Sequence, residues 1–251
     1  MISDRLQWMG AVVRHTRNPV PIFREWLGWQ RQPYRVASRG GILFELRPGR
    51  GDWYIFMETV LRSDYLHLGQ RLEKDMTVVD VGANVGGFTV FASQRVGPQG
   101  CVIAVEPEPN SFRQLQVNAR LNPQNAPIQA LCCAVGSQPG EAVLHSDLNA
   151  AWSSFHQTET RSTAVDVKVP VLTLADVFDQ TGTDRCHYLK IDTEGSEYDI
   201  IGALTPALAS RIEQITVELH EIPGQEPSEI HSKLKDLGYA VKPGTLTYAY
   251  R

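Results

Sequence analysis

The sequence has few of the features that mark specialised classes of protein. Only four of its 251 residues are cysteine, and no two of them form a Cys-x-x-Cys pair, which argues against a disulfide framework and against the common zinc motifs. No apolar run approaches the roughly 20 residues of a membrane-spanning helix, and the first five residues lack the apolar core of a signal peptide. We therefore expect a cytoplasmic protein with no transmembrane segment, whose cysteines are buried free thiols.

Internal repeats and low-complexity segments are also missing, so the 42% of hydrophobic residues can build one large core. Charge is distributed unevenly. Residues 1–50 contain nine arginines and three acidic residues, a balance of +6; because the whole chain is −4, the remaining residues carry −10. No nucleic-acid-binding motif accompanies these arginines, so we expect no nucleic-acid partner. The basic segment either packs on the core through two short helices or contacts an acidic acceptor, a carrier protein or a membrane surface.

A glycine-rich turn follows the first core strand that we expect, at residues 77–81. The turn contains Gly82, Asn84 and Gly86 and opens a helix, which is the arrangement of a nucleotide-cofactor loop. About two dozen residues after Gly82, a second apolar strand ends in Glu106, where a carboxylate can accept hydrogen bonds from the two hydroxyls of a ribose. The loop and the acid together predict a cofactor crevice.

The residues of this loop favour S-adenosylmethionine (SAM) over a dinucleotide. Dinucleotide folds place glycine at the middle position of G-x-G-x-x-G so that the backbone can approach a pyrophosphate. Here that position is Asn84, and Asp80 adds negative charge beside it. SAM carries no phosphate, and its ammonium suits Asp80, directly or through water. In the usual order of this fold the adenine would lie between Glu106 and Ala134, with Pro107 in its wall.

A second motif is the acidic string Lys-Ile-Asp-Thr-Glu-Gly-Ser-Glu of residues 190–197, at the end of another apolar strand. Together with the Asp-Val-Gly-Ala-Asn-x-Gly loop of residues 80–86 and with Glu106-Pro107, in this order, the string resembles the FkbM family of SAM-dependent methyltransferases. The resemblance covers roughly residues 76–220. It implies a class I methyltransferase fold and methylation of hydroxyl groups on sugars or polyketide-type natural products, and it carries no acceptor identity.

Apolar strands alternate with helical segments from residue 77 onward. We therefore expect an α/β fold of the class I methyltransferase (Rossmann-like) type, a doubly wound and mostly parallel sheet with an antiparallel C-terminal edge. We divide the chain into an N-terminal helical and hairpin extension, or cap, at 1–75 and a methyltransferase domain at 76–251. The expected elements are a hairpin over 34–46, strands at 77–81, 101–105, 128–133, 187–191, 213–219, 239–242 and 245–250, and helices at 4–17, 20–29, 58–72, 86–96, 109–120, 172–179, 197–209 and 227–237.

Residues that follow different strands should meet, because ligands in a doubly wound sheet lie over the carboxyl ends of the strands. An alcohol is a poor nucleophile until its proton leaves, so the acceptor hydroxyl needs a general base. His220 is the first candidate because imidazole titrates near neutrality, and Asp192, expected to face the sulfonium, is the second. Glu194 completes the catalytic set. Asp192 has two further interpretations, as the partner of the SAM ammonium or as a helix cap.

The polar stretch 146–167 is the expected lid over the acceptor. Rings and hydroxyls there would pack on and hydrogen-bond to a polyol or a ring, and the residues concerned are Trp152, Ser153, Ser154 and His156.

Two acids beyond the lid are also expected at the acceptor. Glu197 and Glu218 follow core strands, although Glu197 can instead bind its own loop through backbone amides, with Gly195 allowing the tight turn. His145 and His156 are alternative bases, and Lys190 is expected to balance the charge of the acidic cluster.

Other mechanisms and functions stay open. Asp192, Glu194 and Glu218 are hard oxygen ligands that suit Mg²⁺, so a metal-dependent O-methyltransferase is an alternative to the metal-free enzyme that we expect. N-methylation needs less help from a base, but the Asn-Pro-Pro-aromatic string of many amide and base methylases is missing. A non-catalytic SAM-binding scaffold and, less well supported because of Asn84, an NAD-linked oxidoreductase remain. A homo-oligomer is compatible with all of these.

Overall fold

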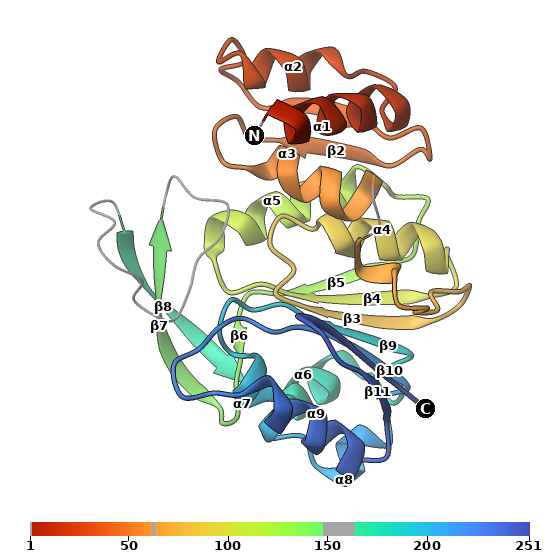
Figure 1. Cartoon of the computed structure of the whole chain (residues 1–251), viewed down its shortest axis with the longest axis vertical. Helices are drawn as coiled ribbons and strands as arrows, with labels where there is room; N and C mark the ends of the chain where they lie inside the picture. Colours follow the sequence, from red (N-terminus) through yellow and green to blue (C-terminus); the bar gives the residue numbers. More distant parts are fainter. Residues whose placement is uncertain (1, 62–63, 148–163) are drawn as a thin grey trace.

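A seven-stranded sheet forms the centre of the molecule. The computed structural model describes residues 2–61, 64–147 and 164–251. The strand order is β11-β12-β10-β9-β3-β4-β5, and all neighbours are parallel except β12, which runs antiparallel to β10 and β11 (Figure 1). This arrangement confirms the expected α/β fold class and its antiparallel C-terminal edge. The strands are β3 (Thr77–Val81), β4 (Cys101–Val105), β5 (Ile128–Leu131), β9 (Tyr188–Ile191), β10 (Gln214–Glu218), β11 (Ala240–Lys242) and β12 (Leu246–Tyr250).

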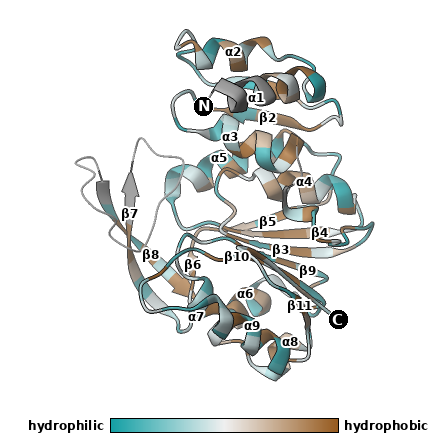
Figure 2. Cartoon of the chain, in the orientation of Figure 1, coloured by the Kyte–Doolittle hydropathy of each residue, from teal (hydrophilic) through white to brown (hydrophobic). Residues whose placement is uncertain are grey.

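Both faces of this sheet are covered. Nearly all residues of β3, β4 and β9 are buried, as expected for parallel strands between two helical layers, and Figure 2 shows β3 and β4 as predominantly hydrophobic. Successive side chains point to opposite faces, so Val78 belongs to one hydrophobic cluster and Val79 to the other. On one side lie α4 (Gly87–Val96) and α5 (Pro109–Arg120), and on the other α6 (Leu174–Thr181), α7 (Glu197–Gly202), α8 (Pro206–Ala209) and α9 (Pro227–Asp236) (Figure 1).

The N-terminal segment packs on the α4 face of the sheet. Its two helices and its antiparallel hairpin lie close to where the sequence predicts them, as α1 (Ile2–His15), α2 (Val20–Trp26), β1 (Tyr34–Ala37) and β2 (Leu43–Leu46). Phe44 and Phe56 are fully buried in one cluster with Phe88 of α4 and Val78 of β3. The segment and the sheet therefore share a hydrophobic core.

The predicted helix at 58–72 was wrong at both ends. The helical region begins earlier, as α3 (Asp52–Ile55), continues as a six-residue π-helix, η1 (Phe56–Leu61), and is followed by a short 3₁₀ turn, η2 (Asp64–Leu66). Gly51, with φ 77°, changes the chain direction before α3, a conformation that favours glycine. The start was missed because this turn was not recognised as a helix boundary.

A second, smaller sheet flanks the polar stretch 146–167 that was predicted as the lid. The strands β7 (Gly140–Asp147) and β8 (Ala164–Leu172) form an antiparallel hairpin, and β6 (Ala134–Val135) pairs with β8. The polar stretch was therefore predicted too long at both ends, since 146–147 belong to β7 and 164–167 to β8. The alternation of valines in β8, which is a strand pattern, was not recognised beside the Ser/Thr-rich residues.

Other element boundaries differ as well. The predicted strand 128–133 ends at Leu131, and α6 begins at Leu174 rather than at 172, since Thr173 forms a capping box with Asp176. The predicted helix 197–209 is divided in two because Thr205 caps a new helix with Pro206 in its first turn.

The four cysteines are all free thiols and differ in how far they are buried. Cys133 and Cys186 are buried as predicted, Cys101 is half-buried, and the prediction was wrong for Cys132, which is exposed. Burial raises the pKa of Cys133 to about 11 and that of Cys186 to about 12, so neither is a ready nucleophile. Among the described residues, no helix combines the length and the apolar character needed to cross a membrane.

Candidate active site

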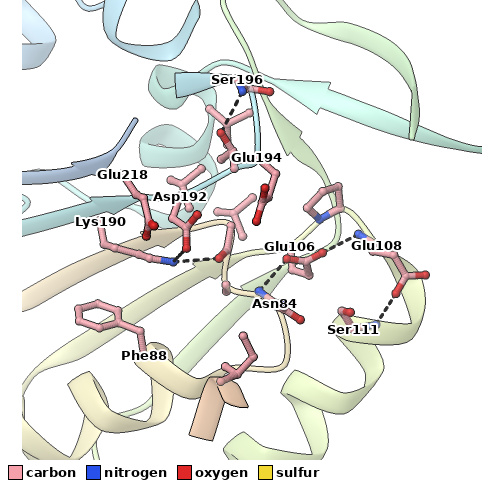
Figure 3. Close-up of a pocket in the computed structure, with 18 of the residues that line it drawn as sticks. Asn84, Phe88, Glu106, Glu108, Ser111, Lys190, Asp192, Glu194, Ser196 and Glu218 are labelled. Atoms are coloured by element: carbon pink, nitrogen blue, oxygen red, sulfur yellow. Dashed lines mark hydrogen bonds and ion pairs between the residues drawn. The ribbon is translucent and has the colours of Figure 1, made fainter. Parts of the chain in front are cut away.

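One cavity of about 230 Å³ opens at the carboxyl ends of the parallel strands (Figure 3). Loops that follow β3, β4, β9 and β10 meet there, as the doubly wound topology requires. Most of the residues singled out in the sequence line it: Gly82, Asn84, Glu106, Pro107, Ala134, Asp192, Glu194 and Glu218. Four others do not line it: Asp80, Gly86, Glu197 and His220. Trp152, Ser153, Ser154 and His156 lie outside the described residues, and His145 is described only as a backbone position of β7.

The glycine-rich loop has the backbone conformation that its residues suggest. Gly82, Asn84 and Gly86 all have positive φ values, of 79°, 49° and 86°, and asparagine is one of the few residues other than glycine that adopt this region readily. A Cβ atom on Gly82 would lie 1.6 Å from the carbonyl oxygen of Asp192. Glycine is therefore required there for the loops after β3 and β9 to touch. Gly86, by contrast, is the N-cap residue of α4.

Glu106 is held in place by the backbone around it. Its Oε2 accepts a hydrogen bond from the N–H of Asn84 at 2.7 Å, and its Oε1 accepts one from the N–H of Glu108 at 2.8 Å (Figure 3). Burial raises the pKa of Glu106 to about 7. Each carboxylate oxygen keeps a further lone pair, so this fixed carboxyl group at the end of β4 can accept two more hydrogen bonds from a ligand.

The wall next to Glu106 contains residues that sequence reasoning missed. Glu108 is the N-cap of α5, and its Oε2 accepts a hydrogen bond from the N–H of Ser111 at 2.6 Å. Cys133, Val135 and Leu144 add apolar surface beside Pro107 and Ala134, and all of them line the cavity. The N-cap could have been found, because Glu108 precedes Pro109 at the start of a helical pattern. Leu144 could not, since it belongs to the unpredicted sheet.

Asp80 is placed differently from the prediction. It is fully buried and does not line the cavity; the hydroxyl of Thr89 donates to its Oδ2 at 2.5 Å, and the Nζ of Lys190 lies 3.3 Å from its Oδ1. Lys190 also lies 3.3 Å from Oδ2 of Asp192 and donates to the carbonyl of Gly82 at 3.0 Å. Lys190 thus balances the acidic cluster, as predicted, and lines the cavity that Asp80 does not reach.

The charge of Lys190 is stable in this setting. Burial acts to lower its pKa, but the carboxylates of Asp80 and Asp192 outweigh that effect and hold the pKa above its usual value.

Asp192 and Glu218 are joined by a tyrosine that the sequence did not indicate. The Tyr65 hydroxyl lies 2.8 Å from Oδ2 of Asp192 and 3.0 Å from Oε2 of Glu218. All three residues line the cavity. Burial and the neighbouring charge of Asp192 raise the pKa of Glu218.

Glu197 binds its own loop, which was the second of its two interpretations. It is fully buried and accepts hydrogen bonds from the N–H groups of Thr193, at 2.9 Å, and Gly195, at 3.1 and 3.2 Å. Glu194, with φ 55°, is turned by this loop toward the cavity that it lines. The structure therefore does not place Glu197 where an acceptor would touch it.

His220, the first candidate for a base, lies behind this loop. Its Nδ1 is 3.1 Å from Oε1 of Glu197, and its Nε2 is 3.4 Å from Oε2 of Glu194. The hydrogen bond to Glu197, together with the charge of Glu194, raises the pKa of His220 to about 9. The ring is therefore protonated near neutral pH, so it has no lone pair with which to accept a proton, and it does not line the cavity.

Asp192, Glu197 and His220 bring ligand atoms within 4.8 Å of one another. Hydrogen bonds hold this group together without an ion, since backbone amides and His220 already contact Glu197. Asp192 and Glu218, two of the candidate ligands in the alternative with Mg²⁺, are bridged by Tyr65. These contacts give no support to the Mg²⁺ alternative.

The N-terminal segment forms the remaining wall of the cavity, through Tyr54 and Ile55 of α3 and Glu58 and Thr59 of η1. This wall is seated directly on the start of α4: a Cβ atom on Gly87 would lie 2.3 Å from Oγ1 of Thr59 and 2.7 Å from Cγ2 of Ile55. No motif in the sequence indicates these residues, because they are brought to the cavity by packing alone.

Comparisons with known proteins agree with this geometry. The family model described as "Methyltransferase FkbM domain" matches residues 80–241. "Methyltransferase 1" of Beauveria bassiana is 29% identical over 66% of this chain and 73% of its own length. The "31-O-demethyl-FK506 methyltransferase FkbM" of Streptomyces tacrolimicus is 27% identical over 75% of this chain and 82% of its own length.

A third relative, the "Hexuronic acid methyltransferase AglP" of Haloferax volcanii, is 24% identical over 66% of this chain and 64% of its own length. Among solved structures, the methyltransferase FkbM of Methylobacillus flagellatus is 15% identical and covers 79% of this chain and 53% of its own, with a TM-score of 0.42.

Proposed function

Because the chain belongs to the FkbM family of SAM-dependent methyltransferases, we propose that it methylates a hydroxyl group of a small molecule, a sugar or a polyketide-type secondary metabolite. The names of two relatives support this class of acceptor, since one is named for a demethylated oxygen of FK506 and another for a hexuronic acid.

The observation that carries the proposal is the division of one cavity into two chemically different ends. Near β4 and β5, Glu106 stands beside the apolar wall of Pro107, Ala134 and its neighbours. Near β9 and β10, the lining is acidic and includes Asp192, Glu194 and Glu218 (Figure 3). An adenosine suits the first end, and a sulfonium with an acceptor hydroxyl suits the second.

For the cofactor, the chain offers a donor and acceptor set that fits SAM. Glu106 would bind the ribose hydroxyls, the backbone at Gly82 and Asn84 would face the methionine part, and Asp192 would hold its ammonium. When bound, SAM supplies a methyl group on a sulfonium, which an acceptor oxygen displaces in line. Positioning accounts for much of the rate of such a displacement.

For the acceptor, Glu218 is the base that the geometry favours. Its Oε2 contacts Tyr65, while its Oε1 makes no hydrogen bond to any residue in the described ranges. Its raised pKa makes it a better base than an ordinary carboxylate, because a catalytic base works best with a pKa near the working pH. Asp192 is less free, since Lys190 already contacts it, and Glu194 would orient the acceptor.

The first test is titration of the full chain with S-adenosylhomocysteine in a calorimeter. We expect saturable micromolar binding, weakened about 10- to 100-fold by Glu106→Ala because two hydrogen bonds to ribose are lost. Glu229→Ala, on the exposed start of α9, is the matched control and should bind as the wild type does. Absence of binding by the folded wild-type protein would contradict the proposal.

The second test follows methyl transfer from labelled SAM to a panel of hydroxylated sugars and polyketides, with and without a chelator. We expect a product methylated on oxygen and an unchanged rate after chelation. Activity that disappears with the chelator and returns with Mg²⁺ would contradict the metal-free form of the proposal.

A further inference from the structure

We propose that Tyr65, which lies outside the residues matched by the family model, is a positioning residue of the active site. Its hydroxyl holds Asp192 and Glu218 side by side and so leaves the second oxygen of Glu218 available to the acceptor. This inference rests on the proposed O-methylation and adds to it a part of the site that the N-terminal segment supplies.

The geometry ties three distant parts of the chain together at one point. Tyr65 belongs to η2, Asp192 follows β9, and Glu218 ends β10. One phenolic oxygen lies within hydrogen-bond distance of both carboxyl groups, at 2.8 and 3.0 Å. Because both contacts use one oxygen of each acid, Oδ2 and Oε2, the direction of each carboxyl group is set by the same atom.

The number of protons available to Tyr65, Asp192 and Glu218 limits which hydrogen bonds they can form. A phenol has a single proton to donate, so it can donate to only one of the two carboxyl groups at a time. The other group must either carry a proton itself and donate to the phenolic oxygen or remain in a weak contact. Lys190 already contacts Asp192, at 3.3 Å, so Glu218 is the acid of the pair that is left to take the acceptor's proton.

Tyr65 is itself held rigidly. Only 8% of its surface is exposed, and the hydroxyl of Tyr188 donates to its backbone carbonyl at 3.1 Å. Its ring meets that of Phe88 edge to face at 5.5 Å between centroids, and Nζ of Lys190 lies 5.0 Å from the ring centroid. A group fixed in this way loses little further freedom when a ligand enters, which is what a positioning residue needs.

Without the hydroxyl, two neighbouring acids would repel each other and the long side chain of Glu218 would sample other rotamers. A base displaced by even about 1 Å can lose on the order of 100-fold in rate. Tyr65→Phe keeps the ring, its contact with Phe88 and the backbone carbonyl that Tyr188 uses, so it removes the link between the two acids and little else.

The experiment compares Tyr65→Phe with Tyr239→Phe in the full-length protein. The control also removes the hydroxyl of a buried tyrosine; this hydroxyl lies 2.8 and 2.9 Å from the carbonyl oxygens of Ala209 and Ile212 and does not contact Asp192 or Glu218. We expect both variants to bind S-adenosylhomocysteine within about threefold of the wild type. In Tyr65→Phe alone, kcat should fall about 10- to 100-fold with the KM for SAM nearly unchanged.

The pH profile separates positioning from simple structural support. The hydrogen bond from Tyr65 acts to lower the pKa of Glu218, so its removal should move the acid limb of the kcat profile to higher pH. If Tyr65 acts through Glu218, adding Tyr65→Phe to Glu218→Gln should slow the enzyme little further, because interacting residues are not additive.

Each outcome decides the matter. A Tyr65→Phe enzyme with kcat within twofold of the wild type, or with an unshifted acid limb, overturns the inference. The inference is also overturned if Tyr65→Phe loses S-adenosylhomocysteine binding and thermal stability together with activity, since that result assigns Tyr65 a structural role. The proposed function, rather than the inference, is contradicted if the wild-type protein binds S-adenosylhomocysteine but does not produce it from SAM with any acceptor tested.

Discussion

Residues 1–75 and 76–251, which we propose as the two units of this chain, reach the same cavity in different ways. In the larger unit, the site residues stand directly after strands of a parallel sheet, at Gly82, Glu106 and Asp192. In the smaller unit, Glu58 and Tyr65 come from a π-helix and a 3₁₀ turn. The first set carries a recognisable motif because strand ends impose fixed spacing. The second set has none, since only packing places it.

In our proposal the two units serve different ligands. The unit with the motif supplies the residues that suit a cofactor common to many enzymes. Tyr65, from the unit without it, contacts Asp192 and Glu218, the acids for which we propose roles in methyl transfer, and an acceptor differs from one enzyme to another. The shared hydrophobic core around Phe56 and Phe88 fixes the position of one unit against the other.

The largest effect should come from the loop of the larger unit. Gly82→Ala would place a Cβ atom 1.6 Å from the carbonyl oxygen of Asp192, so we expect loss of S-adenosylhomocysteine binding and destabilisation of about 3 kcal/mol or more. Gly182→Ala is the matched control: its φ is also positive, at 66°, with no atom within 4 Å of the added Cβ, and it should cost only about 1 kcal/mol. Calorimetry and thermal melting measure both. Equal effects of the two changes would contradict the close approach.

The next prediction tests whether the two units share one core. Phe56→Ala, in the smaller unit, and Phe178→Ala, in the opposite cluster, remove fully buried rings and should each destabilise the protein by about 3–5 kcal/mol. Because Phe56 packs in one cluster with residues of the sheet, each variant should melt in a single transition. Two separate transitions in a calorimetric scan, with only the first shifted by Phe56→Ala, would show that the smaller unit folds independently.

The third prediction concerns the base. Glu218→Gln keeps the shape of the side chain but cannot accept a proton, so methyl transfer should fall by about 100-fold or more, while binding of S-adenosylhomocysteine stays close to that of the wild type. Glu221→Gln, on an exposed position three residues later, should leave the rate unchanged. Retained activity in Glu218→Gln would return the search for a base to Asp192 and to the residues of the lid.

The smallest effect is expected at His220, as a pH dependence of stability. Its folded pKa of about 9 lies above the ordinary value of 6.5, so the stabilisation is complete below pH 6.5 and is lost as pH rises toward 9. His220→Gln should therefore cost roughly 1–2 kcal/mol near pH 6 and much less above pH 9. Denaturant unfolding at several pH values measures this difference. A cost that does not vary with pH would mean that the ring titrates alike in the folded and unfolded protein, so that its pKa is not raised.

Some of the fold was predictable because its signals are local. Valine-rich runs predicted the parallel strands, and the elements at 77–81 and 101–105 have the predicted bounds. The π-helix and the second sheet escaped prediction. The π-helix η1 packs against Gly87, a contact that no local pattern indicates. In the second sheet, polar residues partly conceal the alternation of apolar and polar positions. The contacts of Trp152, Ser153, Ser154 and His156 with an acceptor stay predictions, since these residues lie outside the described ranges.

The sequence by itself determined where a cofactor loop would form and which strand ends would carry acids, because glycine conformations and the spacing of apolar runs act over a few neighbouring residues. Only the tertiary structure decided which acids face the cavity. Lys190 lies 3.3 Å from both Asp80 and Asp192, but Asp80 is fully buried and Asp192 lines the cavity. Glu197 is likewise buried, while Glu218 lines the cavity. It also decided that His220 is charged and that Tyr65 joins the site. Both results depend on groups brought together from distant parts of the chain, and burial and neighbouring charges set the protonation of each.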